Sequence, residues 1–162
     1  MIAPRRGEAL YVAGGVAVLG LGLWMWALGR GPAASDAGAR PRLRVTGAYA
    51  VRVSASTEVS AYLTARNTGG GADRLIAVRT DLSPIVMMHR GLENAMVAVD
   101  SVPLPARRTV SLTPSGLHVM IMQPRRAVRV GERVRLTLLF SRSDPISVGA
   151  PVLAPGDRPP DG

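Results

Sequence analysis

Hydrophobic and polar residues alternate with a period of two over several short segments after residue 41. Every odd position between residues 59 and 66 is apolar, and every even position between 133 and 140 is apolar. Successive side chains of a β-strand point to opposite faces, so this period predicts strands that bury one face. The pattern predicts about eight strands, near residues 43–49, 59–67, 73–79, 84–89, 95–99, 109–113, 117–122 and 133–141.

These strands predict an all-β fold. No segment beyond residue 41 shows the 3.6-residue repeat of an amphipathic helix. Short strands with one apolar face bury that face when two antiparallel sheets pack into a sandwich. The 18 glycines and 13 prolines suit many turns, and with one Phe and two Trp the core must be mainly aliphatic.

The N-terminal segment differs from the rest of the chain. Arg5 and Arg6 precede a stretch of uncharged residues, Leu10 to Leu28, which as a helix is just long enough to cross a bilayer. We expect an uncleaved transmembrane anchor; a cleaved signal peptide ending near the small residues 33–35 is the alternative. In both cases positive residues before the helix place the domain outside the cytoplasm, at the membrane or in the periplasm.

The expected organisation has four parts. Residues 1–29 form the anchor or signal helix, 30–41 a flexible linker, 42–153 the β-sandwich and 154–162 a disordered tail rich in Pro and Gly. The domain boundaries follow these changes in composition.

Composition excludes several functions. The formal net charge is +9 and every basic residue is Arg, but the arginines are scattered and aromatic residues are few, which disfavours nucleic-acid binding. The absence of Cys excludes disulfides, thiolate metal sites and lipid attachment through a thiol. Two histidines without an evident acidic partner, and no Gly-x-Ser-x-Gly motif, disfavour an enzyme.

Histidine and methionine occur together. Both histidines, His89 and His118, have methionines beside them, and all five methionines beyond residue 29 lie between 87 and 122. Thioethers are soft ligands that select Cu(I), and imidazole also binds copper, so a His/Met set without carboxylates favours Cu(I) over zinc or calcium. A blue-copper electron carrier would need a Cys thiolate. The structural alternative is that these methionines simply fill the core.

Strand alternation predicts where these side chains point. In 117–122, Val119 and Ile121 enter the core, whereas His118 and Met120 point to the other face. We expect Met96 outside the core too, so that the ligands lie at the surface of a sheet.

The chain resembles the periplasmic copper chaperones of the PCu(A)C type. The resemblance rests on Met96 followed after 21 residues by His118-Val119-Met120, on the segment 59–69 (A-Y-x-T-x-x-N-x-G), and on Leu104-Pro105-Ala106. It spans roughly residues 43–150. Only six residues separate His89 from Met96, fewer than is usual in the family, so Met87 or Met88 could replace His89; a shortened hairpin would explain the spacing.

The resemblance implies a cupredoxin-like Greek-key sandwich that holds one Cu(I) ion through His89, Met96, His118 and Met120. It also implies delivery of copper to a cytochrome c oxidase subunit or to another copper chaperone. Two alternatives remain: copper sequestration, tolerance or uptake, and a metal-free, membrane-tethered interaction module. Further contacts to copper from Met87, Met88 or Met122 stay open.

Overall fold

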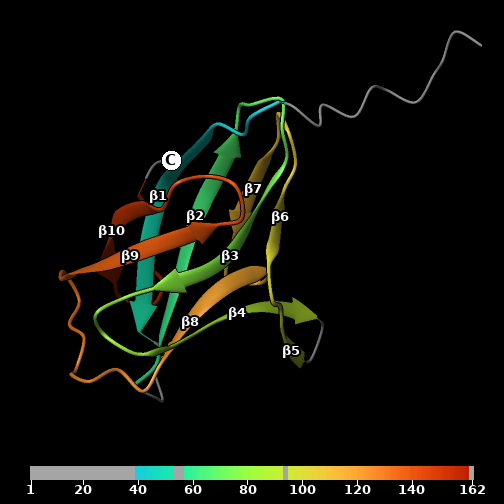
Figure 1. Cartoon of the computed structure of the whole chain (residues 1–162). Helices are drawn as coiled ribbons and strands as arrows, with labels where there is room; N and C mark the ends of the chain where they lie inside the picture. The colour runs from blue at the N-terminus through green and yellow to red at the C-terminus, as the bar shows by residue number, and fades with distance from the viewer. Residues whose placement is uncertain (1–38, 53–56, 93–94, 161–162) are drawn as a thin grey trace, which may run out of the picture. The chain divides into compact units, whose positions relative to one another are not determined.

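The domain is built from strands alone in the part of the chain that the structure describes. The computed structural model describes residues 39–52, 57–92 and 95–160. The strands, shown in Figure 1, are β1 (Leu43–Arg52), β2 (Val59–Asn67), β3 (Asp73–Arg79), β4 (Ile85–Leu92), β5 (Ala95–Ala98), β6 (Val102–Leu104), β7 (Thr109–Leu112), β8 (Leu117–Met122), β9 (Arg133–Phe140) and β10 (Ile146–Leu153). The prediction of an all-β fold is therefore confirmed for these residues.

The strands form two layers joined by β10. Hydrogen bonds connect them in the order β5-β4-β8-β2-β1-β10-β9-β3-β6, and β7 pairs with β2 beside β8. Strand β10 runs antiparallel to β9 over most of its length and ends parallel to β1, through Ala50 opposite Val152. Figure 1 shows β9 and β3 crossing in front of β1 and β2. The path thus turns over at β10 and encloses a core between β5-β4-β8-β2-β1 and β9-β3-β6.

The core contains the side chains that the alternation predicts. The odd positions of β2 from Val59 to Ala65 are at most 2% exposed, and the even positions of β9 from Val134 to Phe140 are at most 7% exposed. Val119 and Ile121 of β8 are fully buried among them. Burial of aliphatic side chains from both layers is the main favourable contribution to folding.

Two strands, β6 and β10, were missed by the sequence pattern. Both contain proline, which has no N–H for a ladder bond and argues against a central strand. Pro103 is tolerated because β6 is the last strand of its layer. Pro151 lies where β10 leaves β9 for β1, so the strand continues although one donor is absent.

Asn67 joins three segments at one end of the domain. Its side chain is 1% exposed and forms four hydrogen bonds with the backbone. Oδ1 accepts from the N–H groups of Arg42 (3.1 Å) and Gly69 (3.0 Å), and Nδ2 donates to the carbonyls of Gly71 (2.8 Å) and Leu104 (3.1 Å). The start of β1, the β2–β3 turn and β6 are therefore connected through one fully satisfied amide.

Glycine is required in the same turn. A Cβ atom at Gly69 would lie 2.3 Å from the carbonyl oxygen of Arg40, closer than any real Cβ contact. This Gly-rich turn between β2 and β3 is a site where two backbones approach closely.

The expected N-terminal helix lies outside the described residues, as does most of the linker. Within the residues that the structure describes, no helix has the length and hydrophobicity needed to span a membrane.

Replacement of Asn67 by Ala tests the amide network. Four backbone groups, three of them buried, lose their partner, so we expect the free energy of unfolding to fall by roughly 3 kcal/mol, measured by urea denaturation. The control is Thr68→Ala at the exposed neighbour, which should change it by no more than about 0.5 kcal/mol. Equal effects for the two variants would contradict this role of Asn67.

Candidate metal centre

Strands β4 and β8 bring two imidazoles and two thioethers onto one face. In their antiparallel register His89 stands opposite His118, and Met87 stands opposite Met120. Opposed residues of such a pair point to the same face, with Cβ atoms about 4.5–5.5 Å apart. The imidazole rings meet edge to face, with centroids 5.9 Å apart and planes inclined by 70°. The two histidines, distant in sequence, are therefore neighbours.

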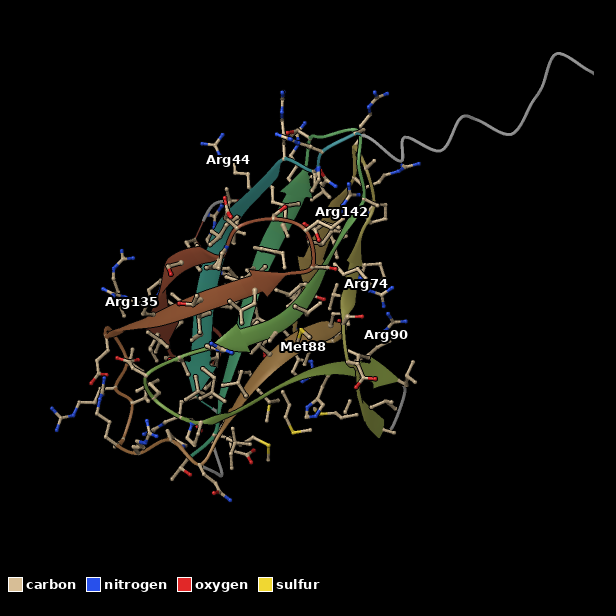
Figure 2. The ribbon with its side chains drawn as sticks, viewed as in Figure 1. Arg44, Arg74, Met88, Arg90, Arg135 and Arg142 are labelled. Carbon is tan, nitrogen blue, oxygen red and sulfur yellow. The ribbon has the colours of Figure 1, made fainter. Side chains whose placement is uncertain are left out.

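The opposite face of the same strands is the core. Met88 is 6% exposed and belongs to the core cluster with Val119 and Ile121. Figure 2 shows the sulfur of Met88 on the other side of β4 from the remaining sulfur atoms nearby. Met88 therefore points away from the histidines, whereas Met87 shares their face.

Met96 belongs to the hairpin that β4 forms with β5. Strand β5 pairs with β4 so that Met96 stands opposite Gly91 and Ala98 stands opposite His89. Met96 is thus on the face of His89, at a diagonal position that lies about 7–8 Å away in a sheet. Its side chain is 66% exposed, and its three rotatable bonds allow the sulfur to move. The short spacing between residues 89 and 96 corresponds to this hairpin.

His118 is held in one tautomer. Its Nδ1 lies 3.0 Å from the carbonyl oxygen of Gly116. A carbonyl only accepts hydrogen bonds, so Nδ1 is the donor, and in a neutral imidazole Nε2 is then the nitrogen with a lone pair for a metal. Metal-binding histidines commonly donate their second N–H to such a carbonyl, which orients the ring.

His89 has an unpaired nitrogen. Its Nδ1 is buried and is the one buried side-chain nitrogen or oxygen without a hydrogen-bond partner among the described residues. A buried polar atom left unsatisfied costs about 1–3 kcal/mol, and native structures usually pair it with a protein group, a water or an ion. This unpaired atom leaves His89 free to bind a ligand.

Met120 is oriented by a hydroxyl group from β2. The Oγ of Ser60 donates to the sulfur of Met120 over 3.1 Å, and the two residues are opposed in the β2–β8 register. Thioether sulfur is a weak acceptor, so the bond restricts the sulfur without competing strongly for its lone pairs.

Two tyrosines line the site beyond β8. The ring of Tyr62 lies 6.4 Å from that of His118 and 4.9 Å from that of Tyr49, centroid to centroid. Burial raises the pKa of Tyr49, and the nearby Tyr62 raises it further. Tyr49 therefore stays neutral at physiological pH and brings no negative charge to the site.

The expectation that the ligands lie at the surface is wrong for two of them. His118 is 2% exposed and Met120 is 8% exposed, although neither belongs to the core cluster. The reason is that β8 is an inner strand, with side chains of β4 and β2 on both sides of it. Met96 is 66% exposed, as expected, and Met87 is 39% exposed.

The ligand set suits a soft ion. In the described part of the chain, no group of three or more His, Asp or Glu residues could hold a metal. Hard cations such as Ca²⁺ and Mg²⁺ require oxygen ligands, and zinc sites use Cys, His and carboxylates. Neutral imidazole and thioether groups leave copper in the +1 state as the best match.

Sequence reasoning missed Ser60, Tyr49 and Tyr62 as parts of the site. The alternation of 59–66 places Ser60 and Tyr62 on the polar face, but only the pairing of β2 with β8 brings them to Met120 and His118. Met122 also shares the face of Met120, opposite Ile85 in β4.

Comparisons with known proteins match this architecture. Residues 43–152 match the model of a family described as "Putative lipoprotein LpqE-like". A protein of Leifsonia xyli subsp. xyli (strain CTCB07), "Putative lipoprotein Lxx21020", is 27% identical over 107 residues, which are 63% of this chain and 64% of that protein. The match therefore spans less than two thirds of the length of that relative.

Solved structures share the fold. The solution structure of CuI-DR1885 from Deinococcus radiodurans is 33% identical, covers 75% of this chain and 86% of that chain, and superposes with a TM-score of 0.58. The copper-bound PCuAC domain from PmoF2 is 22% identical, covers 72% of this chain and 99% of that chain, and superposes with a TM-score of 0.62.

The unpaired nitrogen of His89 predicts a difference between the two histidines in the metal-free protein. His89→Leu removes an uncompensated polar atom, so we expect the free energy of unfolding to stay within about 0.5 kcal/mol of wild type or to rise. His118→Leu removes the bond to Gly116 and should cost about 1 kcal/mol. Urea denaturation with a Cu(I) chelator present measures both; a larger loss for His89→Leu would contradict the assignment.

Proposed function

Because this chain belongs to the LpqE-like family and carries a domain of the PCuAC type, we propose that it is an extracytoplasmic copper chaperone. It binds one Cu(I) ion through His89, Met96, His118 and Met120. Family membership makes copper the expected cargo, and the arrangement of the side chains supports the choice of ligands.

The observation that carries the proposal is the pairing of His89 with His118 across β4 and β8. The pairing brings together two imidazoles, one whose Nδ1 is bonded to the Gly116 carbonyl and one whose buried Nδ1 has no hydrogen-bond partner. Met120 lies beside His118 in the next outward position of β8, and Met96 is carried by the adjoining hairpin. The unpaired nitrogen favours His89 over Met87 as the fourth ligand.

The burial of the ligands supports transfer as well as binding. His118 and Met120 are buried and held by hydrogen bonds, whereas Met96 is 66% exposed on the outermost strand of its layer. An acceptor can displace Met96 first, while the buried ligands still hold the ion. All four ligands are neutral, so no buried negative charge is left when Cu(I) departs.

The location follows the relatives and the N-terminal sequence. The relatives are described as lipoproteins, but this sequence has no Cys to carry a lipid, so we assign anchoring to the apolar stretch Leu10 to Leu28. The domain then stands on the extracytoplasmic side of the cell membrane, or in the periplasm if the segment is cleaved. Its partners are a copper-accepting subunit of cytochrome c oxidase or another copper chaperone.

A Cu(I) competition titration tests the ligand set. We expect one ion per chain, and loss of more than about 100-fold in affinity for His118→Ala and for Met120→Ala, since even outer-shell changes typically cost about 10- to 100-fold. His89→Ala and Met96→Ala should weaken binding in the same direction. The matched control is Met88→Leu, a core substitution of similar volume beside His89, which should leave the affinity unchanged.

Absence of Cu(I) binding by the wild-type chain would refute the chaperone function and favour a metal-free interaction module. Equal loss in Met87→Ala and His89→Ala would instead place Met87 in the ligand set.

Deletion of the gene separates delivery to oxidase from sequestration. If the chain supplies cytochrome c oxidase, the deletion strain should lose oxidase activity and oxidase-bound copper at limiting copper, and added copper should restore both. Growth at high copper is the control measurement. Normal oxidase copper combined with increased sensitivity to copper would point to sequestration or tolerance.

A further inference from the structure

Two arginines lie directly opposite one another at the far end of the face that carries the metal ligands. Arg44 of β1 is paired with Arg66 of β2, and Thr46, two residues further along β1, is paired with Thr64. Thr109 of β7 stands opposite Arg66 on its other side. These five residues line an open depression of about 630 Å³.

This arrangement is electrostatically unfavourable by itself. Like charges directly opposite in an antiparallel pair destabilise it. Both arginines are exposed, no acidic side chain lines the depression, and neither guanidinium forms a hydrogen bond or ion pair with any residue that the structure describes. By contrast, Arg126 pairs with Glu132 at 2.7 Å, and Arg74 donates to Ser101. Two guanidinium groups without a partner, beside threonine hydroxyls, have the planar hydrogen-bonding geometry that binds carboxylate groups.

The arginine pair and the metal centre share one strand. The even positions of β2 share one face: Ser60 (6% exposed) contacts Met120, Tyr62 (8% exposed) lies beside His118, and Arg66 is exposed in the depression. Arg66 is six positions after Ser60 in β2, which corresponds to about 20 Å along a strand. Figure 2 places Arg44 at the opposite end of the domain from the sulfur atoms near β4 and β8.

That distance fits within one protein interface. A specific interface of standard size buries about 800 Å² on each partner, which is roughly 30 Å across. A protein seated over Met96 and Met120 therefore also reaches Arg44 and Arg66 if its contact runs along β2. Charge at the edge of an interface speeds encounter and fixes orientation.

We propose that Arg44 and Arg66, with the three threonines, bind carboxylate side chains of the protein that exchanges copper with this chain. The arginine pair orients an acidic segment of that partner so that its copper ligands meet Met96. This inference rests on the proposed copper function, but the docking contact itself does not require the metal.

The test uses a synthetic acceptor peptide. The peptide carries a Met-rich Cu(I)-binding segment, a flexible Gly/Ser linker of about twelve residues, whose average span is near 20 Å, and four glutamates. A second peptide has glutamines in place of the glutamates. The protein variants are Arg44→Gln with Arg66→Gln, and the charge-matched control Arg133→Gln with Arg135→Gln on β9 of the other layer.

Three quantities are measured: affinity of the metal-free protein for each peptide, rate of Cu(I) transfer, and affinity for Cu(I). We expect the Arg44/Arg66 variant to bind the glutamate peptide about tenfold more weakly, the sum expected for two exposed ion pairs. Transfer to that peptide should slow by a similar factor, and wild-type binding should weaken with salt. The Arg133/Arg135 variant should bind the glutamate peptide and transfer Cu(I) to it like wild type. Binding of the glutamine peptide and the affinity for Cu(I) should not change in the Arg44/Arg66 variant.

Equal weakening in the Arg133/Arg135 control, or equal binding of the two peptides by wild type, overturns the proposal. The proposal is also overturned if the Arg44/Arg66 variant loses binding to phosphatidylglycerol vesicles but still binds the glutamate peptide like wild type. The arginine pair would then bind a membrane surface. If no protein binds Cu(I), the chaperone function fails, and the metal-free peptide affinities still decide the docking contact.

Discussion

The register between β4 and β8 is the constraint on which the candidate site depends. It places His89 opposite His118 and, on the other face of the same strands, buries Met88 with Val119 and Ile121. Because side chains alternate between faces, a slip by one residue would expose the core side chains and bury the ligands on the wrong side. The core therefore stabilises the register, and the register assembles the site. No separate stabilising element is needed to bring the histidines together.

The site combines fixed and free ligands. The bonds from His118 to Gly116 and from Ser60 to Met120 hold two of the proposed ligands in place without an ion, so little ordering of these side chains would be left to occur on binding. Met96 lies on an outermost strand, where few neighbours restrict it. A carrier must bind its ion and also release it, and the proposed combination of buried His118 and Met120 with exposed Met96 would serve both needs.

The outer face of β2 connects the two ends of the domain. At one end Ser60 and Tyr62 contact the candidate ligands, and at the other Arg66 stands beside Arg44. The Asn67 amide lies at the arginine end and ties β1 to β2 and β6, so the position of Arg66 is fixed by the adjoining network. A face that is neutral and sulfur-rich at one end and cationic at the other has a defined orientation toward a partner.

The sequence by itself determined the faces of the strands. Period-two alternation was sufficient to assign Val119 and Ile121 to the core and His118 and Met120 to the opposite side, and the clustering of His with Met was sufficient to suggest a soft metal. These properties are local, since each depends only on the alternation of side chains along one strand. The same local rule failed at β6 and β10, where proline is tolerated only because of the position of the strand in its layer.

Tertiary structure alone decided which strands are neighbours. Pairings between segments far apart in the chain bring His118 to His89 and Ser60 to Met120. They also make β8 an inner strand, in which His118 and Met120 are buried. Such pairings depend on the packing of the whole core, and the sequence of one strand does not specify which strands it pairs with. For that reason the ligand types could be recognised in the sequence, whereas their burial, their hydrogen bonds and the unpaired nitrogen of His89 could be found only in the folded chain.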